Sequence, residues 1–187
     1  MMRHNFRKDL PKGHEGERVL HEMHSEFLTR TDGKNGDFIY ARSGEKKVLE
    51  LKSEISYSST NPNSDAAREF REAMRIPPPS RGRDWRPTPN LFVERYSSKE
   101  AMSPGGPWQA QGHGAEYYVH LFFGDGAVFA YRTDEMVAFM EENMSKYDPH
   151  DVQNQGYDTT GFRVPRAHVA HLEIDLFPVW EPTVVSG

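Results

Sequence analysis

Two carboxylates and an ammonium group stand close together near the end of the first quarter of this 187-residue sequence. Glu50 and Lys52 alternate along an apolar stretch, and Asp37 precedes them by about a dozen residues. Hard divalent cations prefer carboxylate oxygens, and a cation held in this way can activate a water and neutralise a phosphate. These residue types therefore indicate metal-assisted hydrolysis of a phosphodiester.

Two short strands joined by a tight turn are expected to carry these groups. Residues 38–40 and 48–51 have strand-forming composition, and Ser43-Gly44-Glu45 between them suits a hairpin turn. Side chains two apart on a strand share one face, so Glu50 and Lys52 should lie side by side. A tight hairpin also brings Asp37, at the start of the first strand, close to Glu50, while the Leu51 carbonyl can face a bound metal.

An amphipathic helix is predicted before the hairpin, over residues 14–28, with boundaries at Lys12-Gly13 and at Thr31-Asp32-Gly33. Its early part contains Gly16-Glu17. Glu15 and Glu17 lie on opposite borders of the apolar stripe, and helix geometry alone does not choose between them as an acid near the hairpin. The apolar residues recur at helical spacing: Val19, Leu20, Met23 and Phe27.

This ordered set resembles the PD-(D/E)xK nuclease superfamily, which has the restriction-endonuclease-like fold. In that family a helix contributes an acid, the next strand an Asp and the following strand a Glu-x-Lys. Gly16-Glu17 is similar to the helical Gly-Glu of Holliday-junction resolvases and related small bacterial nucleases. The resemblance covers residues 13–54, and it departs from the family where Asn35-Gly36 precedes Asp37 without a proline.

The resemblance implies that Asp37 and Glu50 bind Mg²⁺ or Mn²⁺, that Lys52 orients the water or neutralises the transition state, and that Glu17 completes the metal site. The implied fold is α/β, with a central mixed β-sheet flanked by helices. The implied activity is that of a metal-dependent DNA endonuclease, of resolvase-like type. A two-fold homodimer would supply the two sites that cutting both strands requires. The small size also fits a nuclease of a phage or mobile element.

Other functions are compatible with the same residues. The fold could belong to a catalytically inactive protein that binds nucleic acid or another protein, or to a hydrolase that acts on RNA. Glu50 and Lys52 would then form a solvated ion pair, and Asp37 would be a turn residue after Gly36. Three histidines on the first helix offer either an imidazole metal site or a hydrated helix border: His14, His21 and His24.

A proline- and arginine-rich loop is predicted over residues 77–89. Arg81, Arg83 and Arg86 could guide a phosphate backbone, and Trp85 could stack on a base. An ordinary solvated loop is the alternative. Glu94, on a strand predicted after this loop, could add a further acid near the site, but a role as a structural ion-pair partner is the favoured interpretation.

The rest of the chain has alternating helix, strand and loop signals. Ser64 or Asn63 can cap a helix, and Thr133 can cap another. Trp108 and an aromatic group around Tyr117, Tyr118, Phe122 and Phe123 are expected in the core, and His113 in a loop. The predicted ranges are helices at 64–74 and 133–144, strands at 91–96, 115–123, 127–131, 162–164 and 172–176, and loops at 103–107 and 147–160.

Composition limits the class of protein. The length fits one domain spanning residues 1–187, and the absence of cysteine restricts any metal to oxygen or imidazole ligands. A formal net charge of -5 excludes a general basic coating for nucleic acid, although a local basic track remains compatible with it. The sequence shows no apolar run of bilayer length and no secretory signal, so a cytoplasmic protein without a membrane partner is expected.

Overall fold

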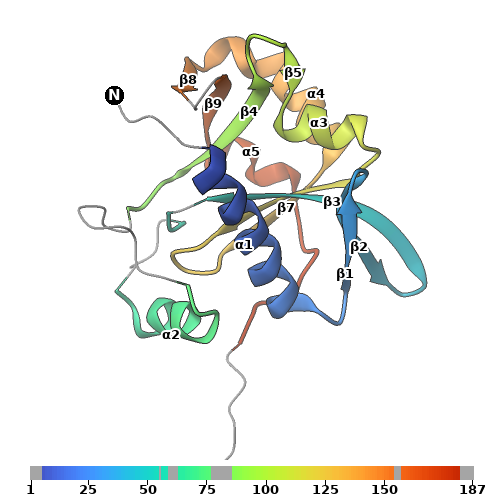
Figure 1. Ribbon diagram of the computed structural model, residues 1–187, viewed down its shortest axis with the longest axis vertical. Helices are drawn as coiled ribbons and strands as arrows, with labels where there is room; N and C mark the ends of the chain where they lie inside the picture. Colours follow the sequence, from blue (N-terminus) through green and yellow to red (C-terminus); the bar gives the residue numbers. More distant parts are fainter. Residues whose placement is uncertain (1–5, 55, 59–62, 77–85, 154–156, 182–187) are drawn as a thin grey trace, which may run out of the picture.

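The computed structural model describes residues 6–54, 56–58, 63–76, 86–153 and 157–181. Within these residues the fold is α/β, with a mixed six-stranded sheet, a second four-stranded sheet and five α-helices (Figure 1). The elements are α1 (Phe6–His24), β1 (Leu28–Gly33), β2 (Gly36–Arg42), β3 (Glu45–Glu54), α2 (Asp65–Ala73), β4 (Asn90–Ser98), β5 (Ser103–Pro104), α3 (Gly106–Gly112), β6 (Tyr117–Phe122), β7 (Val128–Arg132), α4 (Thr133–Asn143), the 3₁₀ turn η1 (Met144–Lys146), β8 (Pro149–Gln153), β9 (Asp158–Pro165), α5 (Arg166–Val169), the 3₁₀ turn η2 (Ala170–Leu172) and β10 (Glu173–Ile174).

The larger sheet has the strand order β1-β2-β3-β6-β7-β10, and the smaller one β5-β4-β9-β8. The first three strands form an antiparallel meander, β3 pairs in parallel with β6, and β6 and β7 form a hairpin. The predicted mixed sheet is therefore present. The second sheet was not predicted, and it means that the larger sheet is not flanked by helices alone.

Each face of the larger sheet has its own hydrophobic core. On one face α1 lies across the strands (Figure 1), and its Val19 and Leu20 are fully buried in a core that also contains Phe38 and Leu49. The opposite face is covered by the second sheet together with α3, α4 and α5. Its core contains buried side chains from each of these layers, among them Leu91, Trp108, Tyr118, Met136 and Val169.

Several local predictions are confirmed. The turn between β2 and β3 places Ser43 and Gly44 at positive φ, as a two-residue hairpin requires. Ser64 caps α2, because its hydroxyl oxygen accepts a hydrogen bond from the Ala67 amide at 3.2 Å. The helix at Thr133 also forms, although Arg132 occupies the cap position and Thr133 is already helical.

The predicted first helix is wrong at both ends. It begins at Phe6, so Lys12-Gly13 does not interrupt it, and it ends at His24. One glycine destabilises a helix by only about 1 kcal/mol, which does not prevent helix formation. Residues 28–33 then form strand β1 instead of continuing the helix or turning. This strand lies at the sheet edge with most residues exposed, so it lacks an alternating apolar pattern.

Two predicted loops also contain regular structure. Residues 147–160 include β8, an edge strand with few apolar residues, and the start of β9. The loop predicted over 103–107 gives way to α3, in which Pro107 occupies the first turn and Trp108 is buried as expected. Polar edge strands give weak sequence signals because little of their surface is apolar, and a seven-residue helix is too short to show a clear helical period.

Candidate active site

Asp37 and Glu50 lie opposite each other in the β2–β3 hairpin. The antiparallel register pairs Phe38 with Leu49, which makes Asp37 and Glu50 the next pair outward, on the same face of the sheet. Gly36, just before Asp37, has φ +94°, and a Cβ there would lie 2.5 Å from a Val48 methyl carbon. Only glycine fits this turn into β2, so the backbone that presents Asp37 depends on it.

The pairing of β2 with β3 stops at Phe38 and Leu49, which leaves the backbone polar groups of β3 beyond Leu49 available on that side. The Leu51 amide donates a hydrogen bond to Asp37 Oδ2 at 2.8 Å. The amide and carbonyl of one strand residue point to the same side, so the Leu51 carbonyl also faces the Asp37 side. Two carboxylates and a main-chain carbonyl thus lie along the same edge of β3.

Burial and mutual repulsion disfavour ionisation of both carboxyl groups. Burial raises the pKa of Asp37, the charge of Glu17 raises it further, and the hydrogen bond from Leu51 opposes the change. Burial and the charge of Asp37 raise the pKa of Glu50 to about 7, against the opposing effect of His113. The pair therefore has a strong electrostatic preference for a cation beside it.

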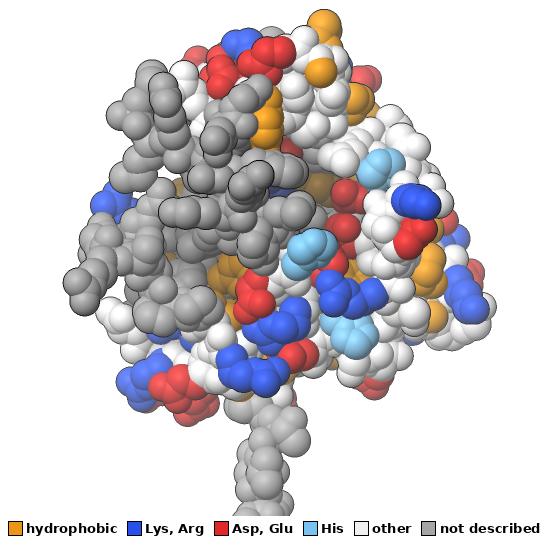
Figure 2. Space-filling model, viewed as in Figure 1, with side chains coloured by type: hydrophobic (Ala, Val, Ile, Leu, Met, Phe, Trp, Pro, Cys, Tyr) orange, Lys and Arg blue, Asp and Glu red, His pale blue; other side chains and the backbone are white. Residues whose placement is uncertain are grey.

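Glu17 approaches this pair from α1. A Cβ at Gly16 would lie only 2.2 Å from Ser53 Oγ, so the glycine allows α1 to pack directly against β3. The Glu17 carboxylate forms an ion pair with Arg30 and lies 3.5 Å from His14 Nδ1. In Figure 2, acidic, basic and histidine side chains are intermixed on the face that α1 crosses.

Glu15, the other helix acid considered, faces a different set of groups. Its carboxylate accepts hydrogen bonds of 2.6 and 3.0 Å from the Arg18 guanidinium, which also donates to the carbonyl of Met74. The Arg18 guanidinium lowers the pKa of Glu15. Glu17, in contrast, acts electrostatically on both Asp37 and Glu50, so the geometry favours Glu17 as the helix acid of this cluster.

Lys52 lies on the same face of β3 as Glu50, and its ammonium donates a hydrogen bond to Glu94 of β4. The Lys52 side chain is 27% exposed and that of Glu94 is 18% exposed, so the pair is largely shielded from water. Burial lowers the pKa of Lys52, but the Glu94 charge and hydrogen bond raise it, and the net direction is upward. Lys52 is therefore a cation at neutral pH. Glu94 forms the ion pair that the sequence predicted.

His113 joins the cluster from the end of α3. Its Nδ1 lies 3.3 Å from Glu50 Oε2. The sequence indicated only a loop histidine between two glycines, because nothing in Gly112-His113-Gly114 shows which strand the end of α3 approaches.

A buried polar group lies further along the same face. His120 is fully buried, and its Nδ1 is 3.3 Å from Glu54 Oε1. Within the described residues, neither His120 ring nitrogen nor the Tyr118 hydroxyl has a hydrogen-bond partner. Glu50, Lys52 and Glu54 therefore face a local group of polar side chains beside the hydrophobic core between the two sheets. Periodicity predicts such a face but not its partners on later strands.

The predicted phosphate-guiding residues can be placed only in part. Arg81, Arg83 and Trp85 lie outside the described residues. Arg86 is exposed, and its carbonyl accepts a hydrogen bond from the Tyr57 amide at 3.3 Å. This contact fixes the backbone just before β4, the strand that carries Glu94.

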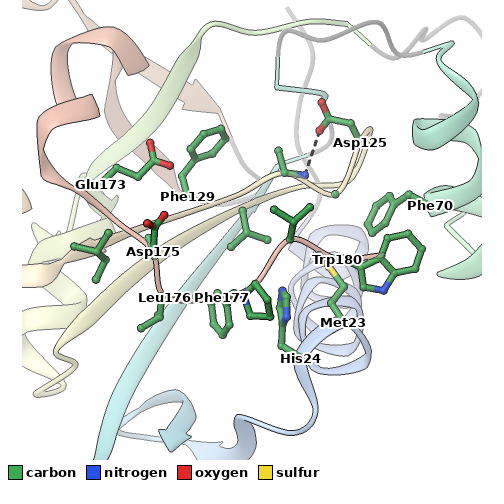
Figure 3. Close-up of a pocket in the computed structure, with 17 residues that line it drawn as sticks. Met23, His24, Phe70, Asp125, Phe129, Glu173, Asp175, Leu176, Phe177 and Trp180 are labelled. Carbon is green, nitrogen blue, oxygen red and sulfur yellow. Dashed lines mark hydrogen bonds between the residues drawn. The ribbon is translucent and has the colours of Figure 1, made fainter. Parts of the chain in front are cut away.

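The three histidines of α1 do not gather at one site. His14 is near Glu17, His21 stacks on Phe38 with ring centroids 6.4 Å apart, and His24 stacks on Phe177 at 4.4 Å. His24 lines a cavity of about 350 Å³ beside Trp180 on the α1 face of the sheet (Figure 3). The residues that line this cavity do not include Glu17, Asp37, Glu50 or Lys52.

The donor set fits a cation site that is completed by water or phosphate. Among the described residues, no group of three or more His, Asp or Glu side chains is arranged to hold a metal ion. Mg²⁺, however, is commonly held by one or two carboxylates together with waters and substrate phosphates. Asp37, Glu50 and the Leu51 carbonyl match this smaller set.

None of the described helices is both long and apolar enough to span a membrane.

A scan of protein-family models and searches of curated proteins and solved structures gave no match to this chain. The functional argument therefore depends on the residues and geometry given above.

Proposed function

We propose that this protein is a metal-dependent endonuclease that hydrolyses DNA phosphodiesters, with a restriction-endonuclease-like core of the PD-(D/E)xK type. The observation that carries the proposal is the placement of Asp37 opposite Glu50, with Lys52 on the same strand face. Glu17 adds a third negative charge from α1. The order of a helix acid, a strand Asp and a neighbouring Glu-x-Lys strand supports the resemblance, although β1 intervenes between helix and Asp.

The charges of the cluster support a role for a cation. Glu17, Asp37 and Glu50 would repel a phosphate, and Lys52 is already paired with Glu94. Mg²⁺ or Mn²⁺ held by Asp37, Glu50 and the Leu51 carbonyl would offset this repulsion, polarise the phosphate and make a nearby water more acidic. Because the pKa of Glu50 is about 7, cation binding must displace a proton at lower pH. Metal affinity should therefore rise as pH increases through about 7.

The side chains of the protein have distinct roles in this proposal. Asp37 and Glu50 bind the cation, and Lys52 remains protonated, so it can neutralise charge that develops on the phosphate. Glu17 can accept a hydrogen bond from a water at the outer side of the site once its ion pair with Arg30 is broken. Arg86, with Arg81, Arg83 and Trp85, is proposed to contact the nucleic acid.

A direct test is cleavage of labelled substrates by the purified chain with Mg²⁺, Mn²⁺ or EDTA. The substrates are a four-way junction, duplex DNA, single-stranded DNA and RNA. Asp37→Asn, Glu50→Gln and Lys52→Met should each reduce cleavage at least about a hundredfold. Glu45→Gln is the matched control, because Glu45 is an exposed acid at the start of the same strand.

Each result has a defined meaning. Cleavage that persists in EDTA, or that survives undiminished in Asp37→Asn and Glu50→Gln, would reject the assigned site. Binding of nucleic acid without cleavage of any substrate would instead support an inactive binding protein. Preferential cleavage of RNA would retain the chemistry and change the substrate. Sedimentation of the chain with and without junction DNA tests the proposed homodimer.

A further inference from the structure

Two polar contacts connect β3 to β4 across the interface between the sheets. Lys52 donates to Glu94, and the Phe92 amide donates to Glu54 Oε1 at 3.1 Å. The paired positions are two residues apart on each strand, so both contacts lie on one face of β3 and one region of β4. The second sheet is thus attached directly beside the proposed catalytic lysine.

The surroundings of Glu94 restrict its position. A Cβ at Gly105 would lie 2.9 Å from Glu94 Cβ, and one at Gly106 would lie 2.7 Å from the Glu94 carbonyl oxygen. Gly106 also has φ +49°, a backbone conformation that favours glycine. The chain entering α3 therefore packs closely against Glu94. The register of β4 against β9 shifts directly after this residue, and such bulges commonly redirect side chains.

The acidic surroundings of Lys52 explain why a fixed partner matters. A lysine side chain is flexible, and its ammonium can donate to any carboxylate within reach. Glu50 and Glu54 each lie two residues away on the same face, and Glu54 acts electrostatically on Lys52. Without Glu94, the ammonium would be attracted to Glu54 and to Glu50, and at Glu50 it would compete for the oxygens that a cation needs.

We propose that Glu94 is a positioning residue for Lys52, holding its ammonium on the Glu50 face of β3 but away from the cation-binding oxygens. This inference rests on the proposed function and extends it, because it makes the second sheet part of the active site. Glu94 acts through Lys52 and needs no contact with the substrate.

The test combines kinetics with Mn²⁺ titration by calorimetry in Glu94→Gln, Glu94→Ala, Lys52→Met and Glu94→Ala/Lys52→Met. Glu94→Ala should lower kcat about tenfold to a hundredfold with little change in KM, since misplacement of a catalytic group has effects of this size. It should also weaken Mn²⁺ binding about threefold or more, because the released ammonium competes with the cation. Glu94→Gln, which retains an acceptor, should show smaller losses of both kinds.

The double variant distinguishes positioning from general damage. In the Lys52→Met background, Glu94→Ala should cause no further loss of kcat and no loss of Mn²⁺ affinity. Glu116→Gln is the matched control. Glu116 is an exposed acid that accepts a 2.7 Å hydrogen bond from the Val48 amide of β3, and its substitution should change neither quantity. Circular dichroism of every variant excludes unfolding.

The outcomes for the two proposals can be told apart. The wild-type protein could cleave DNA and bind Mn²⁺ while the losses from Glu94→Ala and Lys52→Met simply add in the double variant. That result would overturn the positioning role alone. Absence of Mn²⁺ binding to the wild-type chain would overturn the proposed function itself. Mn²⁺ binding without cleavage would reject the nuclease activity, and the affinity changes would still test the position of Lys52.

Discussion

The two faces of β3 are built from alternate residues of one strand and have opposite chemistry. Leu49, Leu51 and Ser53 face α1, where apolar packing and the close approach of Gly16 hold the helix on the sheet. Glu50, Lys52 and Glu54 face the second sheet, where their polar partners come from β4, β6 and the end of α3. One face contributes stability, whereas the other keeps charges in an environment that is unfavourable for them. This division is common where a protein prepares a site for a charged ligand.

The largest expected effect on stability belongs to the α1 face. Leu49 is fully buried, so Leu49→Ala should lower the free energy of unfolding by about 2–5 kcal/mol. Urea denaturation measures this loss, with exposed Lys46→Ala as a control expected to stay within about 0.5 kcal/mol. Mn²⁺ affinity of the folded variant should remain that of the wild type. A large affinity loss with unchanged stability would contradict the division between the faces.

The polar face should show the opposite sign. The pKa of Glu50 rises from 4.5 to about 7 on folding, so the folded state is penalised as pH rises through this range and the group ionises. Glu50→Gln removes that penalty and should stabilise the metal-free protein by about 1–3 kcal/mol at pH 8, with almost no gain at pH 4.5. Thermal unfolding at both pH values provides the measurement. Destabilisation at pH 8 would show that Glu50 contributes to folding instead.

A histidine on the α1 face gives a smaller and oppositely directed pH effect. Burial lowers the pKa of His24 from 6.5 to about 4, so the folded state holds the neutral ring. Its contribution to stability is present above pH 6.5 and is lost as pH falls toward 4. Relative to His24→Phe, which can retain the stacking on Phe177, the wild type should lose about 1–2 kcal/mol between pH 7 and pH 5. Equal pH dependence of the two proteins would argue against a neutral buried ring.

The smallest change in stability is expected at the rim of the site. Arg30 is 43% exposed, and its ion pair with Glu17 should contribute less than about 1 kcal/mol. Arg30→Ala should nevertheless tighten Mn²⁺ binding a few-fold, because it removes a positive charge beside the acids. Calorimetric titration at low and high salt tests this, since added salt should reduce the difference. Weaker Mn²⁺ binding would indicate that Arg30 orients Glu17 for the site.

The sequence was most informative where local pattern determines structure. The turn at Ser43-Gly44 and the alternation around Glu50 predicted the hairpin, and the cap at Ser64 predicted α2. The sequence could not show that His113 would meet Glu50, because that contact depends on how α3 packs. Strands β1 and β8 were missed since exposed edge strands need no apolar alternation. The choice of Glu17 over Glu15 likewise required the packing of Gly16 against Ser53.

The Lys52–Glu94 contact also has a consequence for the timing of activity during protein synthesis. Its partners are 42 residues apart in the chain, and β4 in turn pairs with β9, a strand near the end of the described sequence. Contacts between distant residues form late, after the local meander has had time to fold. Pulse-labelled hydrogen exchange during refolding should therefore protect β2 and β3 before β4. A nascent chain would already contain its acidic cluster while its lysine is still unplaced, so the proposed nuclease activity would begin only after β9 has been synthesised.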